Sequence, residues 1–89
     1  MRVVFTQQGW NDLIWWYDQD RTNVFKVLDL LRDCQRDPWK GVGKPEPLKH
    51  LKPNWSRRID KAHRLIYQVS GKDESYQLMI VACRGHYDG

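Results

Sequence analysis

Apolar side chains recur at helical spacing in the first third of the chain, which predicts two helices. Four residues of the first helix fall at positions i, i+3, i+4 and i+7: Trp10, Leu13, Ile14 and Tyr17. We expect this stripe to face a core, in a helix that Thr6 caps and that runs to about Tyr17. Trp15 and Trp16 extend the aromatic surface around the same helix, and one of them is a candidate partner contact.

A second helix is predicted to start near Asp20, whose side chain is a suitable cap, and to end before Asp37-Pro38. Its apolar residues again lie at helical spacing: Val24, Val27, Leu28, Leu31 and Cys34. A tight turn joins the two helices, which form an αα-hairpin.

Short segments with the composition of strands lie on both sides of the helical region. Residues 2–5 form the first predicted strand, and three more are predicted at residues 55–60, 64–69 and 76–84. The links at residues 60–63 and 70–75 suit antiparallel hairpins.

Alternation along the strand at 64–69 divides its side chains between two faces. One set shares a parity: Leu65, Tyr67 and Val69. If this set meets the helices, Arg64 lies on the opposite, open face. Arg57 shares its parity with Trp55 and Ile59, which sends Arg58 to the other face, although less firmly.

All four prolines lie between Pro38 and Pro53, together with Gly41 and Gly43. Irregular loops longer than about 12 to 15 residues are usually functional or disordered, and prolines favour a held, extended path. We therefore expect an irregular basic loop here rather than a simple connector.

The positive charge of the chain is concentrated in this loop and just after it. The net charge is +4, but residues 39–64 carry eight cations against two acids, a local +6, so the rest sums to −2. Trp39, Trp55 and His50 interleave with the cations and offer stacking planes. We favour a nucleic-acid surface over the alternative, a solvated lysine-rich loop.

Length and composition exclude several classes of protein. A chain of 89 residues predicts a single domain over residues 1–89. The longest apolar run, at 78–83, has six residues, too short for a membrane span, and the start does not resemble a signal peptide. We therefore expect a cytoplasmic protein. Two cysteines and three histidines lack the spacing of a disulfide framework or a metal site, so we expect no metal and no cofactor.

Glu46 is the strongest candidate for chemistry within the basic loop. It is one of only two glutamates in the chain, and Pro45 and Pro47 favour extended geometry around it. Such a carboxylate can accept the proton of a ribose 2′-hydroxyl, while Arg64 and a second cation screen the charge that builds on the phosphate.

The leaving 5′-oxygen in such a reaction needs a proton donor. His86 can supply the proton, and Tyr87 can donate a hydrogen bond or stack on a base. Taken alone, a surface ion pair for Glu46 and an ordinary chain end for His86 and Tyr87 are simpler interpretations.

Four motifs carry a more specific signal when they are taken together. They read GKPEPLKH at residues 43–50, WSRRI at 55–59, HRLIY at 63–67 and ACRGHY at 82–87. The chain resembles the YoeB branch of the RelE/ParE toxin superfamily over nearly its whole length. The resemblance implies a small α+β fold, with two N-terminal helices packed on a twisted antiparallel sheet. It also implies a toxin that acts as a ribosome-dependent, metal-independent endoribonuclease and cuts mRNA in the ribosomal A site.

Position by position, the resemblance implies roles for individual residues. Glu46 would be the general base and Arg64 the phosphate clamp. His86 would be the general acid or a stabiliser of the transition state, and Tyr87 the catalytic aromatic residue near the C-terminus. The predicted contacts with RNA or the ribosome are Lys44, Lys49, His50, Lys52, Arg57 and Arg58.

A toxin of this kind implies an antitoxin partner, whose acidic, flexible segment would fold on the basic groove. By analogy with the family, two copies of the chain can also associate, with the Trp-rich helix surfaces as a contact. Composition leaves the oligomeric state open.

Two other functions remain open from the sequence. One is a non-catalytic inhibitor of translation that binds RNA or the ribosome. The other is a gyrase-poisoning toxin of the ParE type, which the Glu, His and Tyr set disfavours. The chain also departs from the family, which often ends at the tyrosine: Asp88 and Gly89 follow it here, and Gly85 stands where an aromatic residue is frequent.

Overall fold

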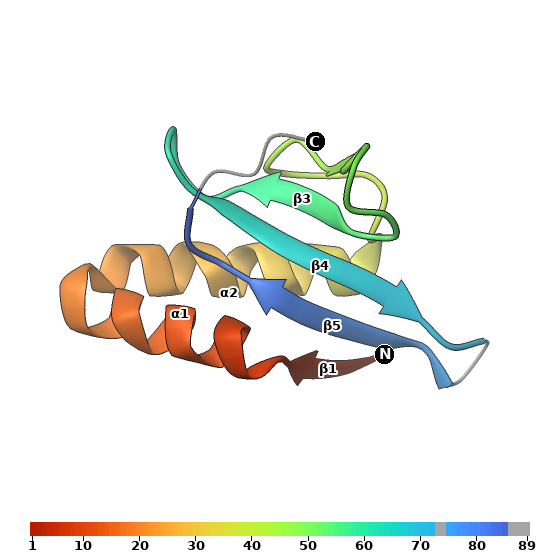
Figure 1. Cartoon of the computed structure of the whole chain (residues 1–89), viewed down its shortest axis with the longest axis horizontal. Helices are drawn as coiled ribbons and strands as arrows, with labels where there is room; N and C mark the ends of the chain where they lie inside the picture. The colour runs from red at the N-terminus through yellow and green to blue at the C-terminus, as the bar shows by residue number, and fades with distance from the viewer. Residues whose placement is uncertain (73–74, 86–89) are drawn as a thin grey trace.

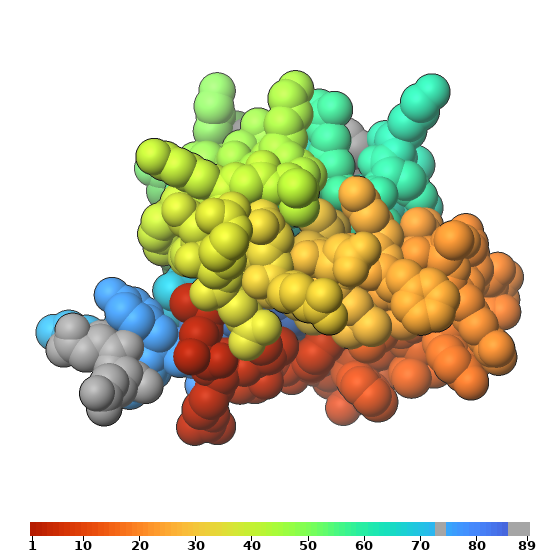
Figure 2. Space-filling view, turned by 180° about the vertical axis from the view of Figure 1, so that it is seen from behind, coloured from red at the N-terminus to blue at the C-terminus, as the bar shows by residue number. Residues whose placement is uncertain are grey.

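Two helices cover one face of a five-stranded sheet, and no helix of the described residues covers the other (Figure 1). The computed structural model describes residues 1–72 and 75–85. The helices are α1 (Gln7–Gln19) and α2 (Arg21–Arg36). The strands are β1 (Arg2–Phe5), β2 (Glu46–Pro47), β3 (Trp55–Arg58), β4 (Arg64–Ser70) and β5 (Gln77–Ala82). Seen from behind, α1, α2 and the loop after α2 form the helical side of the molecule (Figure 2).

The strands lie in the order β1-β5-β4-β3-β2. β1 pairs with β5 in parallel, whereas the other three pairings are antiparallel. The α+β fold with two N-terminal helices is confirmed, on a sheet that is mostly antiparallel. The parallel pairing was not predicted. β1 and β5 are separated in the sequence by both helices and by the other three strands, so the connection is long enough for parallel pairing.

The loop between α2 and β3 is not irregular throughout, which corrects the prediction for residues 38–53. Glu46 and Pro47 form the short strand β2, which pairs with Ser56 and Trp55 of β3. Proline cannot donate to a strand ladder, but it is tolerated at the edge of a sheet, and β2 is such an edge.

Both predicted helix starts are confirmed. The Thr6 hydroxyl accepts a hydrogen bond from the N–H of Gly9 at 3.0 Å and donates one to the carbonyl of Val81 at 2.7 Å. The Asp20 carboxylate accepts the N–H of Thr22 at 3.1 Å at the start of α2. Thr6 therefore caps α1 and also ties it to β5. Within residues 1–72 and 75–85, neither helix has the length and apolarity that a membrane crossing requires.

Leu13 of α1 packs against the core as predicted, whereas the other three positions of the predicted stripe are wrong. Trp10 and Tyr17 are 49% and 51% exposed, and Ile14 is also exposed, whereas Trp16 is only 4% exposed. Gly9 is the other buried residue of the helix. The helix packs on this side because Gly9 has no side chain to hold it away from β5, and because the Trp16 indole N–H donates to the carbonyl of Cys83 at 2.7 Å.

Gly9→Ala is expected to destabilise the fold by about 1 to 3 kcal/mol, because the added methyl group would collide with the backbone carbonyl of Ile80. Alanine is more favourable than glycine in a helix by about 1 kcal/mol, but the loss from the collision should exceed this gain. Urea unfolding measures the change, with Asp18→Ala at an exposed position of the same helix as the control. A Gly9→Ala chain as stable as the parent would contradict this close approach of helix and strand.

The main core lies between the helices and the sheet. α2 contributes Val27, Leu30, Leu31 and Cys34. Val27, Leu31 and Cys34 are buried as predicted, whereas Leu28 is exposed and Leu30 is buried in addition. The sheet contributes residues that include Leu65, Tyr67, Leu78 and Ile80.

A second, smaller cluster lies apart from the main core and consists of Leu48, Ile66 and Ala82. Ile66 alternates with Leu65 and Tyr67 along β4, so this cluster lies on the sheet face opposite the helices. The residues after β2 are therefore fixed to that face through Leu48.

Candidate active site

An acid and an arginine form a pair on the sheet face opposite the helices. Arg64 of β4 donates a hydrogen bond from Nη1 to Oε1 of Glu46 in β2, at 3.1 Å. The Glu46 side chain is 52% exposed and the Arg64 side chain 12% exposed. The carboxylate is thus accessible to a ligand, while the guanidinium is largely enclosed.

The register of the strands explains why these residues meet. Glu46 lies opposite Ser56, and Arg58 lies opposite Arg64. Directly paired residues share a face of the sheet, and so do residues two apart on one strand. Glu46, Arg58 and Arg64 therefore share one face, which confirms the predicted placement of both arginines.

The chain is fixed on both sides of Glu46. Before it, the carbonyl of Gly43 accepts a hydrogen bond from the N–H of Arg58 at 2.6 Å. After it, the buried Leu48 donates its N–H to the carbonyl of Asn54 at 2.9 Å. Glu46 consequently occupies a defined position although it follows a long loop.

The Arg57 side chain is fully buried, so it has no free surface for RNA. The prediction that Arg57 contacts RNA or the ribosome is therefore wrong. Its Nη1 pairs with the Asp33 carboxylate and donates to the carbonyl of Val42 at 3.1 Å. Its Nη2 donates to the carbonyl of Asp37 at 2.6 Å, and its Nε to the Tyr67 hydroxyl at 3.2 Å. Arg57 therefore holds residues 37–42 against α2 and the sheet.

Both members of the Arg57–Asp33 pair are charged at neutral pH. The pKa of the Asp33 carboxyl lies well below its ordinary value, because Arg36 and Arg57 donate hydrogen bonds to it. Burial lowers the pKa of Arg57, but its hydrogen bonds with Tyr67 and Asp33 outweigh burial and raise the pKa above its ordinary value. The loop is thus anchored by a charged pair with multiple hydrogen bonds.

The two tryptophans that were predicted as stacking planes differ in exposure: Trp39 is exposed, and Trp55 is half-buried. Trp39 and Trp55 pack against each other, with ring centroids 4.8 Å apart. Trp55 also packs against the core between the helices and the sheet. The remaining predicted contacts with RNA or the ribosome are exposed: Lys44, Lys49, His50, Lys52 and Arg58.

The chain beyond β5 returns to the neighbourhood of Arg64. The N–H of Arg64 donates to the carbonyl of Gly85 at 2.9 Å, and the N–H of Gly85 donates to Nδ1 of His63 at 2.9 Å. Gly85 ends the part of the chain that the structure describes. The predicted site residues His86 and Tyr87 follow it in the sequence and lie outside the described residues.

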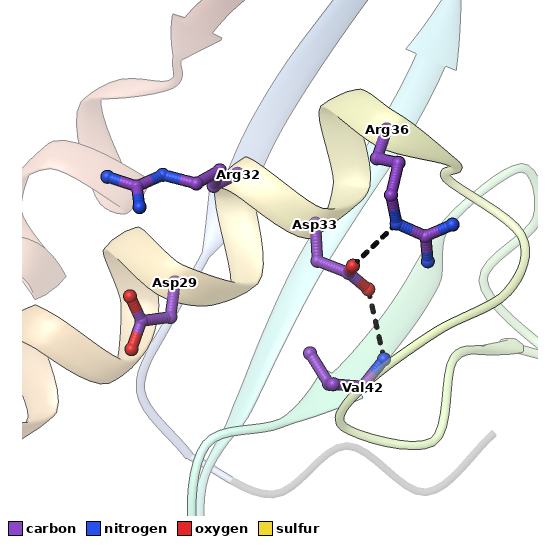
Figure 3. A pocket seen from close by; sticks show the side chains of 5 residues that line it. All are labelled: Asp29, Arg32, Asp33, Arg36 and Val42. Carbon is purple, nitrogen blue, oxygen red and sulfur yellow. Dashed lines mark hydrogen bonds and ion pairs between the residues drawn. The ribbon is translucent and has the colours of Figure 1, made fainter.

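A surface pocket of about 350 Å³ lies elsewhere, on the helical side of the molecule (Figure 3). Its lining residues are Asp29, Arg32, Asp33, Arg36 and Val42. Within it, the Asp33 carboxylate accepts hydrogen bonds from Nε of Arg36 at 2.9 Å and from the N–H of Val42 at 3.0 Å. Asp33 thus fixes the loop at Val42 beside this pocket.

Sequence reasoning missed the structural role of Arg57 and the contact made by His63. The signal for Arg57 was present, because it shares its strand parity with the core residues Trp55 and Ile59. No local signal marks His63 as an acceptor, because its partner Gly85 lies 22 residues away in the sequence.

Comparisons with known proteins identify the family of the chain. Residues 5–87 match the family described as the YoeB-like toxin of bacterial type II toxin–antitoxin systems. The toxin YoeB of Streptomyces coelicolor is 50% identical over 88 residues, covering 98% of this chain and 100% of the relative.

Solved structures give the same result. A YoeB/ParE toxin from Agrobacterium tumefaciens superposes with a TM-score of 0.92 at 43% identity, covering 98% of this chain and 100% of the other. YoeB from Staphylococcus aureus, solved as a dimer, superposes with a TM-score of 0.86 at 34% identity, with 98% of each chain covered. The same toxin in a YoeB–YefM complex gives a TM-score of 0.82 at 34% identity and the same coverage. The chain, with its acid–arginine pair on the open sheet face, belongs to the family of YoeB-like toxins of bacterial type II toxin–antitoxin systems.

Proposed function

We propose that this chain is a ribosome-dependent endoribonuclease, which inhibits translation by cutting mRNA in the ribosomal A site. The observation that carries the proposal is the Glu46–Arg64 pair: an accessible carboxylate bonded to an enclosed guanidinium. Membership of a toxin family supports it, since a toxin needs a damaging activity. The enzyme acts without a metal, because the side chains named here supply both the proton transfers and the charge stabilisation.

The proposed reaction is an attack of the ribose 2′-oxygen on the adjacent phosphorus. Glu46 accepts the proton of the 2′-hydroxyl as the new P–O bond forms. Arg64 binds the phosphate oxygens, whose charge increases in the transition state. The P–O5′ bond breaks, and His86 donates a proton to the leaving oxygen while Tyr87 stacks or donates a hydrogen bond. The products are a 2′,3′-cyclic phosphate and a 5′-hydroxyl.

The exposed cations near the pair provide the attraction for RNA. Arg58 shares the face of Glu46 and Arg64, and Lys44, Lys49, His50 and Lys52 lie exposed in the loop that carries Glu46. Contacts of this kind with phosphates are independent of sequence and weaken as salt increases. They would hold the chain against the A-site codon and the surrounding ribosomal RNA, while Glu46 acts on one phosphodiester linkage.

We also propose a protein partner, an antitoxin with an acidic flexible segment. The YoeB–YefM complex of the Staphylococcus aureus relative supports this proposal, and the solved dimer of that relative supports a homodimer as a second assembly. An acidic segment would compete with RNA for the same cations, because both ligands carry negative charge. Binding of the antitoxin would therefore silence the toxin.

The test of the proposed function is cleavage of a defined mRNA on programmed ribosomes, with primer extension to locate the cut and a no-ribosome reaction as the control. We expect a cut in the A-site codon only when ribosomes are present. The upstream fragment should end in a 2′,3′-cyclic phosphate, and the downstream fragment should begin with a 5′-hydroxyl. Inhibited translation with intact mRNA would favour the non-catalytic binder instead. A 3′-hydroxyl end would contradict the assignment of the 2′-oxygen as nucleophile.

A further inference from the structure

We propose that His63 is a positioning residue: it fixes Gly85 next to Arg64, and Gly85 directly precedes the proposed catalytic residues His86 and Tyr87 in the sequence. The inference rests on the proposed function. Its basis is a single polar contact: Nδ1 of His63 accepts the N–H of Gly85 at 2.9 Å. An imidazole accepts a hydrogen bond only through a nitrogen without a proton, so the contact requires neutral His63 protonated on Nε2.

The backbone of His63 is fixed before the ring makes this contact. His63 closes the turn between β3 and β4, where the Asp60 carboxylate accepts the N–H groups of Ala62 and His63, both at 2.8 Å. The carbonyl of His63 accepts the N–H of Ile59 at 3.0 Å. The turn thus sets the position from which the side chain extends.

The ring of His63 is fixed as well. It packs edge-to-face against the indole of Trp16, with ring centroids 4.7 Å apart and an interplanar angle of 89°. Trp16 is itself buried and bonded through its indole N–H to the carbonyl of Cys83. The imidazole consequently packs against a buried and hydrogen-bonded indole, and its Nδ1 is directed at the N–H of Gly85.

The segment after β5 is held at each of its three described residues. The N–H of Cys83 donates to the Asp12 carboxylate at 3.0 Å, and the Arg84 guanidinium lies 3.8 Å from the ring centroid of Trp15. Gly85 is held at both of its polar groups, by Nδ1 of His63 and by the N–H of Arg64. The bond to His63 is therefore the last side-chain contact described before the two proposed catalytic residues.

Gly85 also has a backbone conformation that makes this contact sensitive. Its φ is 102°, in the region that glycine adopts readily and other residues avoid. Glycine has no side chain that restricts its backbone angles, so the direction of the chain at Gly85 depends on the two hydrogen bonds of this residue. Loss of the bond to His63 would free the segment on one side, and a shift of about 1 Å in a reacting group can cost roughly 10²-fold in rate.

Two variants separate positioning from simple packing of the ring. His63→Phe keeps an aromatic ring against Trp16 but has no acceptor. His63→Asn loses the ring but places its Oδ1 close to the position of Nδ1. We expect the phenylalanine variant to lower kcat roughly 10- to 100-fold on programmed ribosomes, with KM nearly unchanged and an unfolding midpoint like that of the parent. The asparagine variant should retain more of kcat than the phenylalanine variant, although it is less stable. The reverse order of kcat would mean that the ring only packs, and would overturn the proposal.

The amide resonance of Gly85 in a ¹H–¹⁵N spectrum tests the contact independently of activity. We expect it to move upfield and to exchange faster with solvent in His63→Phe, and to stay close to its parental position in His63→Asn. An unchanged Gly85 resonance in the phenylalanine variant would overturn the positioning role, whatever the cleavage rate. A parent chain that cleaves no mRNA would overturn the proposed function instead, and the resonance would still show whether the contact exists.

Discussion

Glu46→Gln is expected to lower the rate of mRNA cleavage about 10²- to 10⁴-fold, the usual contribution of a general base. The amide has the shape of the carboxylate and its oxygen can still accept the hydrogen bond from Arg64. It cannot take up a proton from the 2′-hydroxyl. The chain should therefore bind programmed ribosomes as before while single-turnover cleavage slows.

Stability and binding controls make this result specific. The Glu46 side chain is half exposed, and exposed ion pairs contribute about 0 to 1 kcal/mol, so urea unfolding of Glu46→Gln should match the parent within that range. Asp18→Asn removes an exposed acid from α1, on the helical side of the sheet, and should leave cleavage unchanged. A Glu46→Gln chain that cleaves at the parental rate would remove Glu46 from the mechanism.

Arg57→Met is expected to destabilise the chain by about 3 to 5 kcal/mol, the usual loss when one partner of a buried ion pair is removed. Methionine fills much of the space but leaves the carbonyls of Asp37 and Val42 without the donor that they have now. A domain of this size has roughly 5 to 10 kcal/mol of stability in total, so the unfolded population should rise strongly. Urea unfolding followed by tryptophan fluorescence measures the difference.

Arg58→Met is the matched control, because it removes the same charge from the adjacent residue, which is exposed on the other face of β3. Its effect on stability should lie within about 0.5 kcal/mol, as for most surface substitutions. Its effect on ribosome binding should be larger than its effect on folding. Equal stability of the two methionine variants would show that the buried contacts of Arg57 do not hold the loop.

Local signals predicted the elements well, because they depend on residues close together in the chain. Thr6 and Asp20 cap the helices where they were expected, and the link predicted at residues 60–63 lies within the observed connection between β3 and β4. The buried side of α1 was not predictable in the same way. A stripe through Trp10 and Tyr17 and a stripe through Gly9 and Trp16 have the same spacing, and only contact with β5 selects the second.

The site was predicted in part for a similar reason. Alternation along β4 placed Arg64 on the open face, and the resemblance to a family assigned Glu46 and Arg64 to the same site, where they form a hydrogen bond. A count of charge along the chain ignores alternation, so it included the buried Arg57 with the surface cations. The short strand β2 was missed because prolines on both sides of Glu46 argue against a strand, and tertiary pairing with β3 overrides that preference.

The two-residue strand β2 also bears on how the molecule avoids aggregation through the edge of its sheet. β2 is the last strand at one end of the sheet, where unpaired backbone groups can recruit a strand from another molecule. Pro45 and Pro47 have no N–H to offer such a strand, and the strand is too short for a continuous ladder. The same prolines that flank the proposed base thus make this edge a poor template for aggregation, next to the sheet face that is proposed to bind RNA.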